Sequence, residues 1–330
     1  MSTILRYRCD MTLNIGLIGL GVMGSNHARI IHESPSARLS KLFDANQLVS
    51  EKAARQLGCN AARGIQELED CDAIVIASST NSHADLANHF MALGKPLLIE
   101  KPLCNTLKET TALLEIANLN RIPLMCGFVE RFNPAVLTAL KMIDGPVRHL
   151  YSYRHSPFNP RASSGVVTDL LIHDLDLTAR LAPSDELPKV GASAWSPNER
   201  SFMETADCTL QFGNQMTAIQ SASRWGQRKI REIRISTDNL LLELDLLRVT
   251  VTAYRHRSQD GGNEGGTMSY RSETMIEVPF VRHPGEPLAL QFSHFIDLIK
   301  SNADVQKELD SIVPPHALAE AIEEKSNASA

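Results

Sequence analysis

The segment Ile15–Gly24, with the sequence IGLIGLGVMG, constrains the fold of this chain more than any other feature. It begins as an apolar run and then breaks into three glycines in a GxGxxG pattern, followed by residues that suit a helix. Glycines at this spacing allow a tight strand-to-helix turn and a close backbone approach to a pyrophosphate, which the helix N-terminus attracts. The segment therefore predicts a dinucleotide-binding turn. The residues expected to contact the cofactor there are Gly19, Gly21, Val22, Met23 and Gly24.

The composition argues against several classes of partner. A net charge of −5 and a pI near 6.1 give no attraction to nucleic acid or to an anionic membrane. No apolar run has the length of a membrane span, and we expect no signal peptide. The six cysteines lack a CxxC pair and metal-ligand spacing, which favours reduced thiols, a cytoplasmic location and no metal site. Residues 1–11 are expected to be a disordered leader or to precede an alternative start.

Apolar runs alternate with helix-like segments through the first third of the chain. Short apolar runs separated by helices of this length indicate βαβ units and a doubly wound parallel sheet, with its ligand at the carboxyl ends of the strands. The expected strands are Leu13–Ile18, Leu39–Phe43, Ala73–Ala77, Pro96–Ile99 and Pro123–Phe128, and the expected helices are 22–33, 46–57, 83–93 and 106–119.

After Gly127 the pattern changes to period-two alternation, which is typical of an antiparallel sheet with one open face. We therefore predict an α/β Rossmann domain over 1–127 and an α+β substrate and oligomerisation domain over 128–330. The expected strands are Val147–Tyr153, Ala206–Phe212, Met216–Ser223, Glu232–Ser236, Leu240–Asp245 and Arg248–Tyr254. The expected helices are 134–142, 168–181, 288–301 and 315–325, with loops at 154–165 and 257–269.

Asp44 stands at the end of the second predicted strand. A carboxylate there can accept both hydroxyls of an adenosine ribose, and it repels a 2′-phosphate. Because no arginine follows directly, we expect NAD rather than NADP. Helix capping is the alternative, since Asp44 with Gln47 also fits a reciprocal cap. The two roles are compatible, because a cap leaves one carboxylate oxygen free.

The strand that ends at Ala77 opens into small hydroxyl residues. Such residues at the carboxyl end of a parallel strand suit the floor of a cofactor cleft. An ordinary helix cap by Asn81 or Ser82 is the alternative. The cofactor contacts predicted in this segment are Ser78, Thr80, Asn81 and His83.

Two further groups suit proton and alkoxide chemistry. Lys101 follows strand Pro96–Ile99, where its ammonium can stabilise an alkoxide; a solvated surface lysine is the alternative. Asp169 and His173 are four residues apart on a predicted helix, so both point to one face. An imidazole, with an unperturbed pKa of about 6.5, suits proton transfer at neutral pH. An acidic helix N-terminus beside a packed histidine is the alternative.

Five motifs, in this order, resemble the Gfo/Idh/MocA family, named after glucose–fructose oxidoreductase and inositol dehydrogenase. They are Gly19–Gly24, Ser79–His83, Glu100–Pro102, Gly127–Pro134 and Asp169–Asp176. The resemblance extends to 225–235 and 286–299, so it covers nearly the whole chain after residue 12. It implies a Rossmann domain followed by an α+β domain whose large, mostly antiparallel sheet forms homodimers or homotetramers through its open face.

The resemblance also implies roles for single residues. Lys101 is expected at the reacting hydroxyl, before a cis peptide bond to Pro102. Asp169 and His173 are expected to be the family's acid and its proton-transferring histidine. With Lys101 they form the predicted catalytic set, and all three are expected to contact the substrate. Glu100 and Lys101 are further expected to contact the cofactor.

A narrower resemblance is to UDP-N-acetylglucosamine 3-dehydrogenases, and it rests on segments 130–136, 156–161 and 166–176. Other family members often carry Asn and Arg where Val129 and Glu130 stand, so those substrate contacts do not carry over. Arginine near the cleft suits a diphosphate, although a solvated loop arginine is the alternative for Arg161. The remaining predicted substrate contacts are Arg131, Asn133 and Arg161.

The predicted reaction is NAD-dependent oxidation of a sugar-ring hydroxyl to a ketone, with the 3-OH of a UDP-N-acetylhexosamine as the expected substrate. A dehydrogenase or reductase of a free sugar, inositol or sugar phosphate would use the same residues. NAD-dependent glycoside hydrolysis, without net NADH formation, is another alternative. A non-catalytic dinucleotide-binding sensor is the last one, and the presence of both Lys101 and His173 argues against it.

Overall fold

The computed structural model shows two compact units. One holds the described residues up to Val129 together with Gly285–Glu320, and the other holds Glu130–Pro284 and the chain from Ala321 onward. The predicted leader and Arg161 lie outside the described residues, which are 12–160, 162, 164–183, 187–197, 202–261, 269–301 and 305–328.

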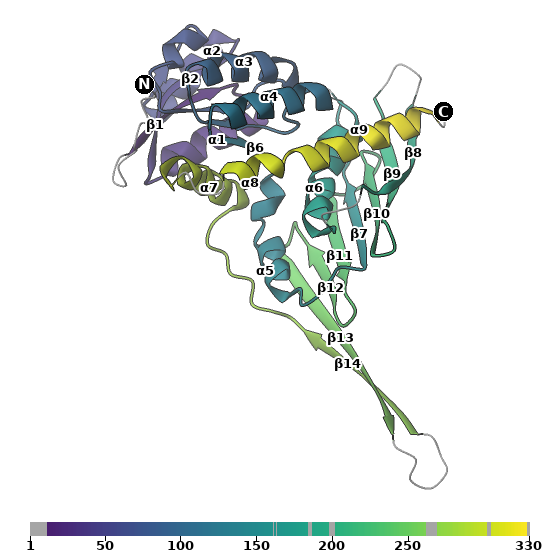
Figure 1. Ribbon diagram of the computed structural model, residues 1–330. Coiled ribbons are helices and arrows are strands. Elements are labelled where there is room, and N and C mark those ends of the chain that lie inside the picture. Colours follow the sequence, from purple (N-terminus) through teal and green to yellow (C-terminus); the bar gives the residue numbers. More distant parts are fainter. Residues whose placement is uncertain are drawn as a thin grey trace. The chain divides into compact units, whose positions relative to one another are not determined.

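Strands β1, β2 and β6 of the first unit are labelled in Figure 1. This unit is built on a six-stranded parallel sheet in the order β3-β2-β1-β4-β5-β6. Its order reverses between β1 and β4, the switch point where doubly wound sheets bind ligands beyond the carboxyl ends of their strands. All residues of β4, β5 and β6 are buried, as expected for parallel strands covered on both faces. The strands are β1 (Leu13–Ile18), β2 (Ala37–Phe43), β3 (Asn60–Ala61), β4 (Ala73–Ile76), β5 (Leu97–Ile99) and β6 (Leu124–Cys126).

The helices of this unit begin and end where local chemistry requires. Thr106 and Glu109 form a reciprocal cap that starts α4, and Gly58, in the left-handed conformation, ends α2. The helices are α1 (Val22–Glu33), α2 (Gln47–Leu57), α3 (His83–Ala92), α4 (Leu107–Leu119), α7 (Pro287–Ser301) and α8 (Val305–Asp310). The residues of α9 (Val313–Ala328) are divided between the two units.

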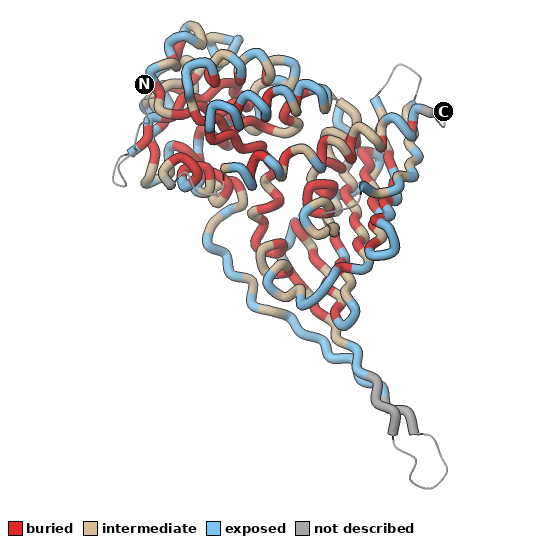
Figure 2. Tube along the Cα trace, viewed as in Figure 1, coloured by how far each residue is buried: buried red, intermediate tan, exposed pale blue. Residues whose placement is uncertain are grey.

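The second unit holds an eight-stranded sheet in the order β14-β13-β12-β11-β7-β10-β9-β8, antiparallel except for the β7–β10 pair. Helices α5 (Pro134–Met142) and α6 (Ile172–Leu181) pack on one face, and buried positions alternate with more exposed ones along strands such as β9 (Figure 2). The strands are β7 (His149–His155), β8 (Lys189–Trp195), β9 (Thr205–Phe212), β10 (Met216–Ser223), β11 (Ile230–Ser236), β12 (Leu241–Asp245), β13 (Thr250–Gly261) and β14 (Ser269–Glu277).

The two predicted sheets are thus confirmed, with local corrections. The predicted helix 168–181 begins as a π-helical turn, η4 (Val167–Leu171), before α6 starts. The predicted loop 257–269 is wrong at both ends, because β13 continues to Gly261 and β14 begins at Ser269. Strands β3, β8 and β14 and helix α8 were not predicted.

Buried ion pairs hold α6 against the sheet of the second unit. The guanidinium of Arg154 on β7 is buried; it donates to Asp174 of α6 at 2.7 Å and to Glu130 at 2.9 Å. Arg231 of β11 also donates to Glu130, at 3.2 Å. Burial alone would raise the pKa of Glu130, but the charges of Arg154 and Arg231 outweigh it and hold the pKa below its ordinary value.

The variant Arg154→Met is expected to lower the free energy of unfolding by about 3–5 kcal/mol, because it leaves buried carboxylates without their shared cation. Urea unfolding followed by circular dichroism measures the loss. Arg148→Met is the matched control, because Arg148 pairs with Asp238 at the surface and its removal should cost no more than about 1 kcal/mol. Equal losses in the two variants would contradict the importance of the buried cluster.

Candidate active site

The glycine turn after β1 is shaped by close backbone packing. Gly19 has φ +90°, and a Cβ on it would lie 2.6 Å from the carbonyl of Ala77. A Cβ on Gly24 would lie 2.0 Å from the carbonyl oxygen of Gly19, so only glycine lets α1 approach the turn this closely. A Cβ on Gly21 would meet no protein atom within 4 Å. Gly19 and Gly24 are therefore packed against protein backbone, whereas the space next to Gly21 is free of protein atoms.

The N-terminus of α1 faces this opening without a side-chain cap. Gly21 is the N-cap residue, no side chain accepts from the first-turn N–H groups, and the first turn contains no acidic residue. Uncapped N–H groups with the positive end of the helix dipole form an anion site. The residues thus fit the pyrophosphate of a dinucleotide, with the backbone at Gly21, Val22 and Met23 as the donors.

A cavity of about 510 Å³ lies at the carboxyl ends of β1, β2 and β4. Of the predicted cofactor contacts, Gly19, Gly21, Asp44 and Ser78 line it. The other lining residues were not among the predicted contacts; they are Ile18, Leu20, Phe43, Ala45, Ala77, Ser79, Ser82 and Leu86. The predicted contacts that do not line this cavity are Val22, Met23, Gly24, Thr80, Asn81, His83, Glu100 and Lys101.

Asp44 connects the second strand to the glycine turn. Its Oδ2 accepts from the Leu20 N–H and its Oδ1 from the Asn46 N–H, both at 2.8 Å. The alternative in which Asp44 and Gln47 cap the next helix is wrong, because Asn46 is the N-cap of α2 and accepts from Leu48 N–H. An ionised carboxylate has about four acceptor positions, so Asp44 keeps acceptor capacity for ribose hydroxyls.

The hydroxyl residues after β4 bond to one another. Ser78 and Ser82 share a hydrogen bond at 2.8 Å, and Ser82 donates to the carbonyl of Ser79 at 2.8 Å. Ser82 is the N-cap residue of α3, yet its side chain makes no capping bond. The loop between β4 and α3 therefore presents ordered hydroxyls at the edge of the cavity.

Lys101 follows β5 at the same edge of the sheet. The peptide bond between Lys101 and Pro102 is cis, as the resemblance implied. Because parallel strands end at one edge, the lysine leaves the sheet on the side where β1, β2 and β4 meet the cofactor cavity.

Asp169 and His173 lie in the second unit, in η4 and near the start of α6. The predicted α-helical spacing of these residues is wrong, because the intervening π turn has i→i+5 geometry. Asp169 lies 3.5 Å from Nη1 of the buried Arg224, whose Nε donates to Glu204 at 3.0 Å. The guanidinium of Arg224, fixed by Glu204, thus lies beside the carboxylate of Asp169.

The residues flanking His173 anchor its helix. Asp174 binds Arg154, and Asp176 accepts from Arg131 Nε at 2.9 Å and Nη2 at 2.5 Å. Thr178 accepts from Gln220 at 2.7 Å. These partners lie on three different elements, and together they fix the rotation of α6 and thereby the direction in which His173 leaves it.

The predicted substrate contacts Arg131 and Asn133 are buried within the fold of the second unit. Asn133 accepts from the Ala135 N–H, which starts α5, and donates to Glu130 and to the carbonyl of Leu246, both at 3.1 Å. Both residues thus have structural roles, and their contact with substrate stays a prediction. The same holds for the meeting of Lys101, in the first unit, with Asp169 and His173, in the second.

Two negative findings apply to the described part of the chain. Within the described ranges, no group of three or more His, Cys, Asp or Glu side chains is arranged to hold a metal ion. None of the helices over these same residues is both long and apolar enough to cross a membrane.

Comparison with known proteins agrees with this geometry. The family described as "Oxidoreductase family, NAD-binding Rossmann fold" matches residues 13–128. UDP-N-acetylglucosamine 3-dehydrogenase of Acidithiobacillus ferrooxidans is 29% identical over 295 residues, covering 89% of this chain and 90% of that protein. Inositol 2-dehydrogenase of Rhizobium meliloti is 31% identical over 230 residues, covering 65% of this chain and 69% of that protein.

A solved structure of the Acidithiobacillus ferrooxidans enzyme superposes with a TM-score of 0.84 at 26% identity, covering 96% of this chain and 99% of that one. Both sheets therefore have a counterpart in an experimental structure.

The variant Gly21→Ala is expected to fold normally and to bind NAD about tenfold more weakly or worse, because its methyl group enters space kept for the pyrophosphate. Gly24→Ala is expected to lose about 1–3 kcal/mol of stability, because its methyl group meets backbone. Calorimetric NAD titration and thermal unfolding separate the two effects.

Gly145→Ala is the control, since a Cβ there also meets nothing within 4 Å. Unchanged NAD affinity in Gly21→Ala would reject the placement of the cofactor at this turn.

Proposed function

This chain belongs to the Gfo/Idh/MocA family of NAD-binding oxidoreductases, and we propose that it oxidises a ring hydroxyl of a sugar to a ketone. The observation that carries the proposal is the position of Lys101, which leaves the parallel sheet at the edge where the cofactor cavity lies. The same unit thus supplies both the dinucleotide turn and a cation for the reacting oxygen.

In the proposed reaction the two hydrogens of the CHOH group leave separately, one as a hydride and one as a proton. When bound, NAD supplies the acceptor for the hydride that leaves the ring carbon. His173 takes the hydroxyl proton, and the C–O bond becomes C=O as the proton and the hydride leave. Lys101 donates a hydrogen bond to the oxygen and stabilises its developing negative charge. Asp169, which lies beside Arg224, orients the substrate or the histidine.

The finer proposal is that the substrate is a UDP-N-acetylhexosamine oxidised at its 3-OH. Its support is the relative from Acidithiobacillus ferrooxidans, a UDP-N-acetylglucosamine 3-dehydrogenase that matches almost the full length of both chains. An inositol is the second candidate, favoured by the inositol 2-dehydrogenase of Rhizobium meliloti at 31% identity. Formation of NADH across UDP-sugars, free sugars and inositols decides between them.

We further propose that the chain acts in the cytoplasm as a homodimer or homotetramer. In support of a reducing compartment, Cys59, Cys71, Cys104, Cys126 and Cys208 are free thiols. In support of an oligomer, the face of the second sheet opposite α6 carries aromatic side chains. Their ring centroids lie 4.7 Å apart for Tyr151–Tyr153, 5.4 Å for Tyr153–His155 and 5.2 Å for Trp195–Trp225.

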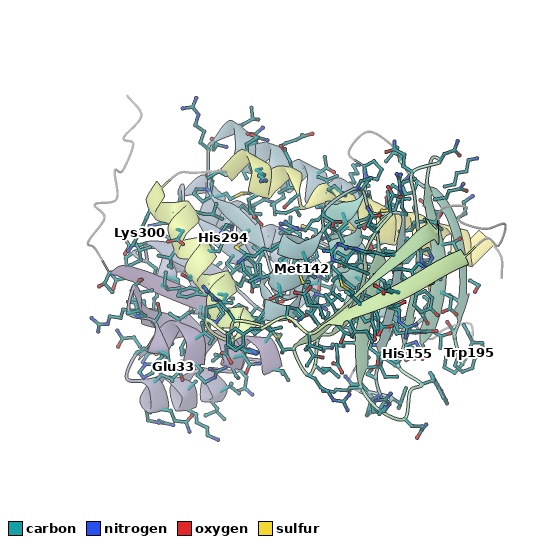
Figure 3. The ribbon with its side chains drawn as sticks, turned by 90° about the horizontal axis from the view of Figure 1, so that it is seen from below. Glu33, Met142, His155, Trp195, His294 and Lys300 are labelled. Carbon is teal, nitrogen blue, oxygen red and sulfur yellow. The ribbon has the colours of Figure 1, made fainter. Side chains whose placement is uncertain are left out.

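This face ends in exposed rings and fits a second copy of the chain. His155 and Trp195 lie at the same end of the sheet (Figure 3), and about half of the surface of Trp195 and of Trp225 is exposed. Ile219 of β10 lies on the same face, beside Tyr151 of β7. Aromatic and aliphatic side chains exposed together on a sheet face are typical of a subunit interface.

The variant Lys101→Ala is expected to lower kcat about 10²- to 10³-fold, the usual loss when one preorganised donor to a developing oxyanion is removed. Its Kd for NAD should stay close to that of the wild type. Steady-state kinetics with the sugar that gives most NADH, and calorimetric NAD titration, measure the two. Lys108→Ala, at an exposed position of α4, is the control. Normal turnover in Lys101→Ala would end the assignment of this lysine.

The variant Ile219→Glu is expected to dissociate the oligomer into monomers, because it places a charge at the centre of the proposed interface. Light scattering after size-exclusion chromatography measures the mass. Leu48→Glu is the control, since Leu48 is an exposed leucine of α2 in the first unit and its change should leave the mass unaltered. A wild-type chain that is already monomeric would refute the proposed interface.

A further inference from the structure

Two buried histidines lie on either side of the turn that carries Lys101. His27 comes from α1, the helix that begins at the glycine turn, and His83 comes from the start of α3. Their exposed fractions are 0% and 1%, so neither is placed to meet solvent. Both contact residues directly next to Lys101, namely Glu100 and Pro102.

His27 binds the turn through Glu100. Its Nε2 lies 2.7 Å from Glu100 Oε1, and Glu100 Oε2 accepts from the Lys101 N–H at 3.3 Å. His27 Nδ1 is buried without a hydrogen-bond partner. A proton on that nitrogen would be an unsatisfied buried donor, so the proton belongs on Nε2, where it is donated to the carboxylate.

Gly127, which directly follows β6, leaves the Glu100 side chain room to bond to His27. A Cβ on Gly127 would lie 2.9 Å from Glu100 Oε2 and 3.0 Å from its Cα. Any larger residue would push the carboxylate away from His27. Helix α1 is therefore connected to the backbone of Lys101 through the side chains of His27 and Glu100.

His83 binds the turn from the other side. Its Nδ1 lies 3.1 Å from the carbonyl oxygen of Pro102 and 3.2 Å from that of Leu103, and its Nε2 lies 3.2 Å from that of Ser78. Ser78 lines the cofactor cavity. The imidazole thus spans the gap between the cavity wall and the residue after Lys101.

Burial lowers the pKa of His83, although the neighbouring carbonyls and the charge of Glu100 oppose the shift. A neutral ring with a single proton is therefore favoured. That proton is donated either from Nδ1 toward the carbonyls of Pro102 and Leu103 or from Nε2 to that of Ser78.

We propose that His27 and His83 are positioning residues that fix the Lys101–Pro102 backbone against the dinucleotide cavity and so aim the lysine ammonium at the substrate oxygen. The inference rests on the proposed role of Lys101. A lysine has a long, flexible side chain, so its direction depends on where its backbone is held. Removing either contact displaces the ammonium without removing it.

The test compares kcat in single and double variants. His27→Leu and His83→Leu are each expected to lower kcat about 10- to 100-fold, the loss produced by a small misplacement of a catalytic group. In the Lys101→Ala background neither change should lower kcat further, because the group they position is gone. If the histidine changes lowered kcat in the Lys101→Ala background by the same factors as in the wild type, the proposal would be overturned. Such losses would show that the histidines affect kcat independently of the lysine.

Conservative variants separate positioning from stability. His27→Gln keeps a donor near the Nε2 position and should retain most of the turnover, whereas His27→Asn is too short and should not. This pair carries the test if His27→Leu fails to fold. Hydrogen–deuterium exchange of the peptide spanning Glu100–Leu103, which needs no turnover, should accelerate in both leucine variants. Unchanged exchange there would overturn the proposal.

Two histidines on the same helices serve as matched controls. His32 is an exposed residue of α1, and His89 of α3 pairs with Glu69 at 3.0 Å. His32→Leu and His89→Leu should leave kcat and the exchange of the turn unchanged. If Lys101→Ala keeps normal turnover, the proposed function fails. If it loses turnover while His27→Leu and His83→Leu keep it, only the positioning role fails.

Discussion

The guanidinium of Arg154 is the constraint on which the second unit depends. It is buried on the central strand β7 and is shared by Glu130, which precedes α5, and Asp174, which belongs to α6. A buried cation is tolerated only when such partners surround it, so α6 and the segment before α5 must lie where Asp174 and Glu130 reach it. Through Asp174, α6 and with it His173 are tied to this buried charge, and the bonds of Asp176 and Thr178 add to that anchoring.

The parallel sheet was predictable because its signals are local. Strands buried on both faces are short apolar runs in the sequence. The turn after β1 requires glycine at positions 19 and 24, because a Cβ at either position would collide with backbone atoms. The hairpin of β13 and β14 was missed for the opposite reason. Residues 272–277 are all exposed, so no buried face imposes a period of two on them. Strand β8 was missed because small residues fill most of its positions.

The candidate site was predictable in its residue types but not in their partners. Lys101 was identified from its place after a strand. The contact of His27 with Glu100 spans 73 positions, and that of Arg224 with Asp169 spans 55, which no local pattern reveals. Asp44 shows the same limit. Its strand-end position was expected, yet its carboxylate is held by the Leu20 N–H of the glycine turn rather than by the following helix.

Each proposed reacting group is fixed by polar contacts that stay inside its own unit. Lys101 is held through Glu100 and Pro102 by helices of the first unit, whereas His173 is held through its neighbours on α6 by Arg154 and Arg131 of the second. Buried hydrogen bonds and ion pairs have narrow geometric tolerance, so they fix the backbone at each of these two residues within its own unit. Under the proposed chemistry, the ammonium of Lys101 and the imidazole of His173 have the same partner, the substrate oxygen.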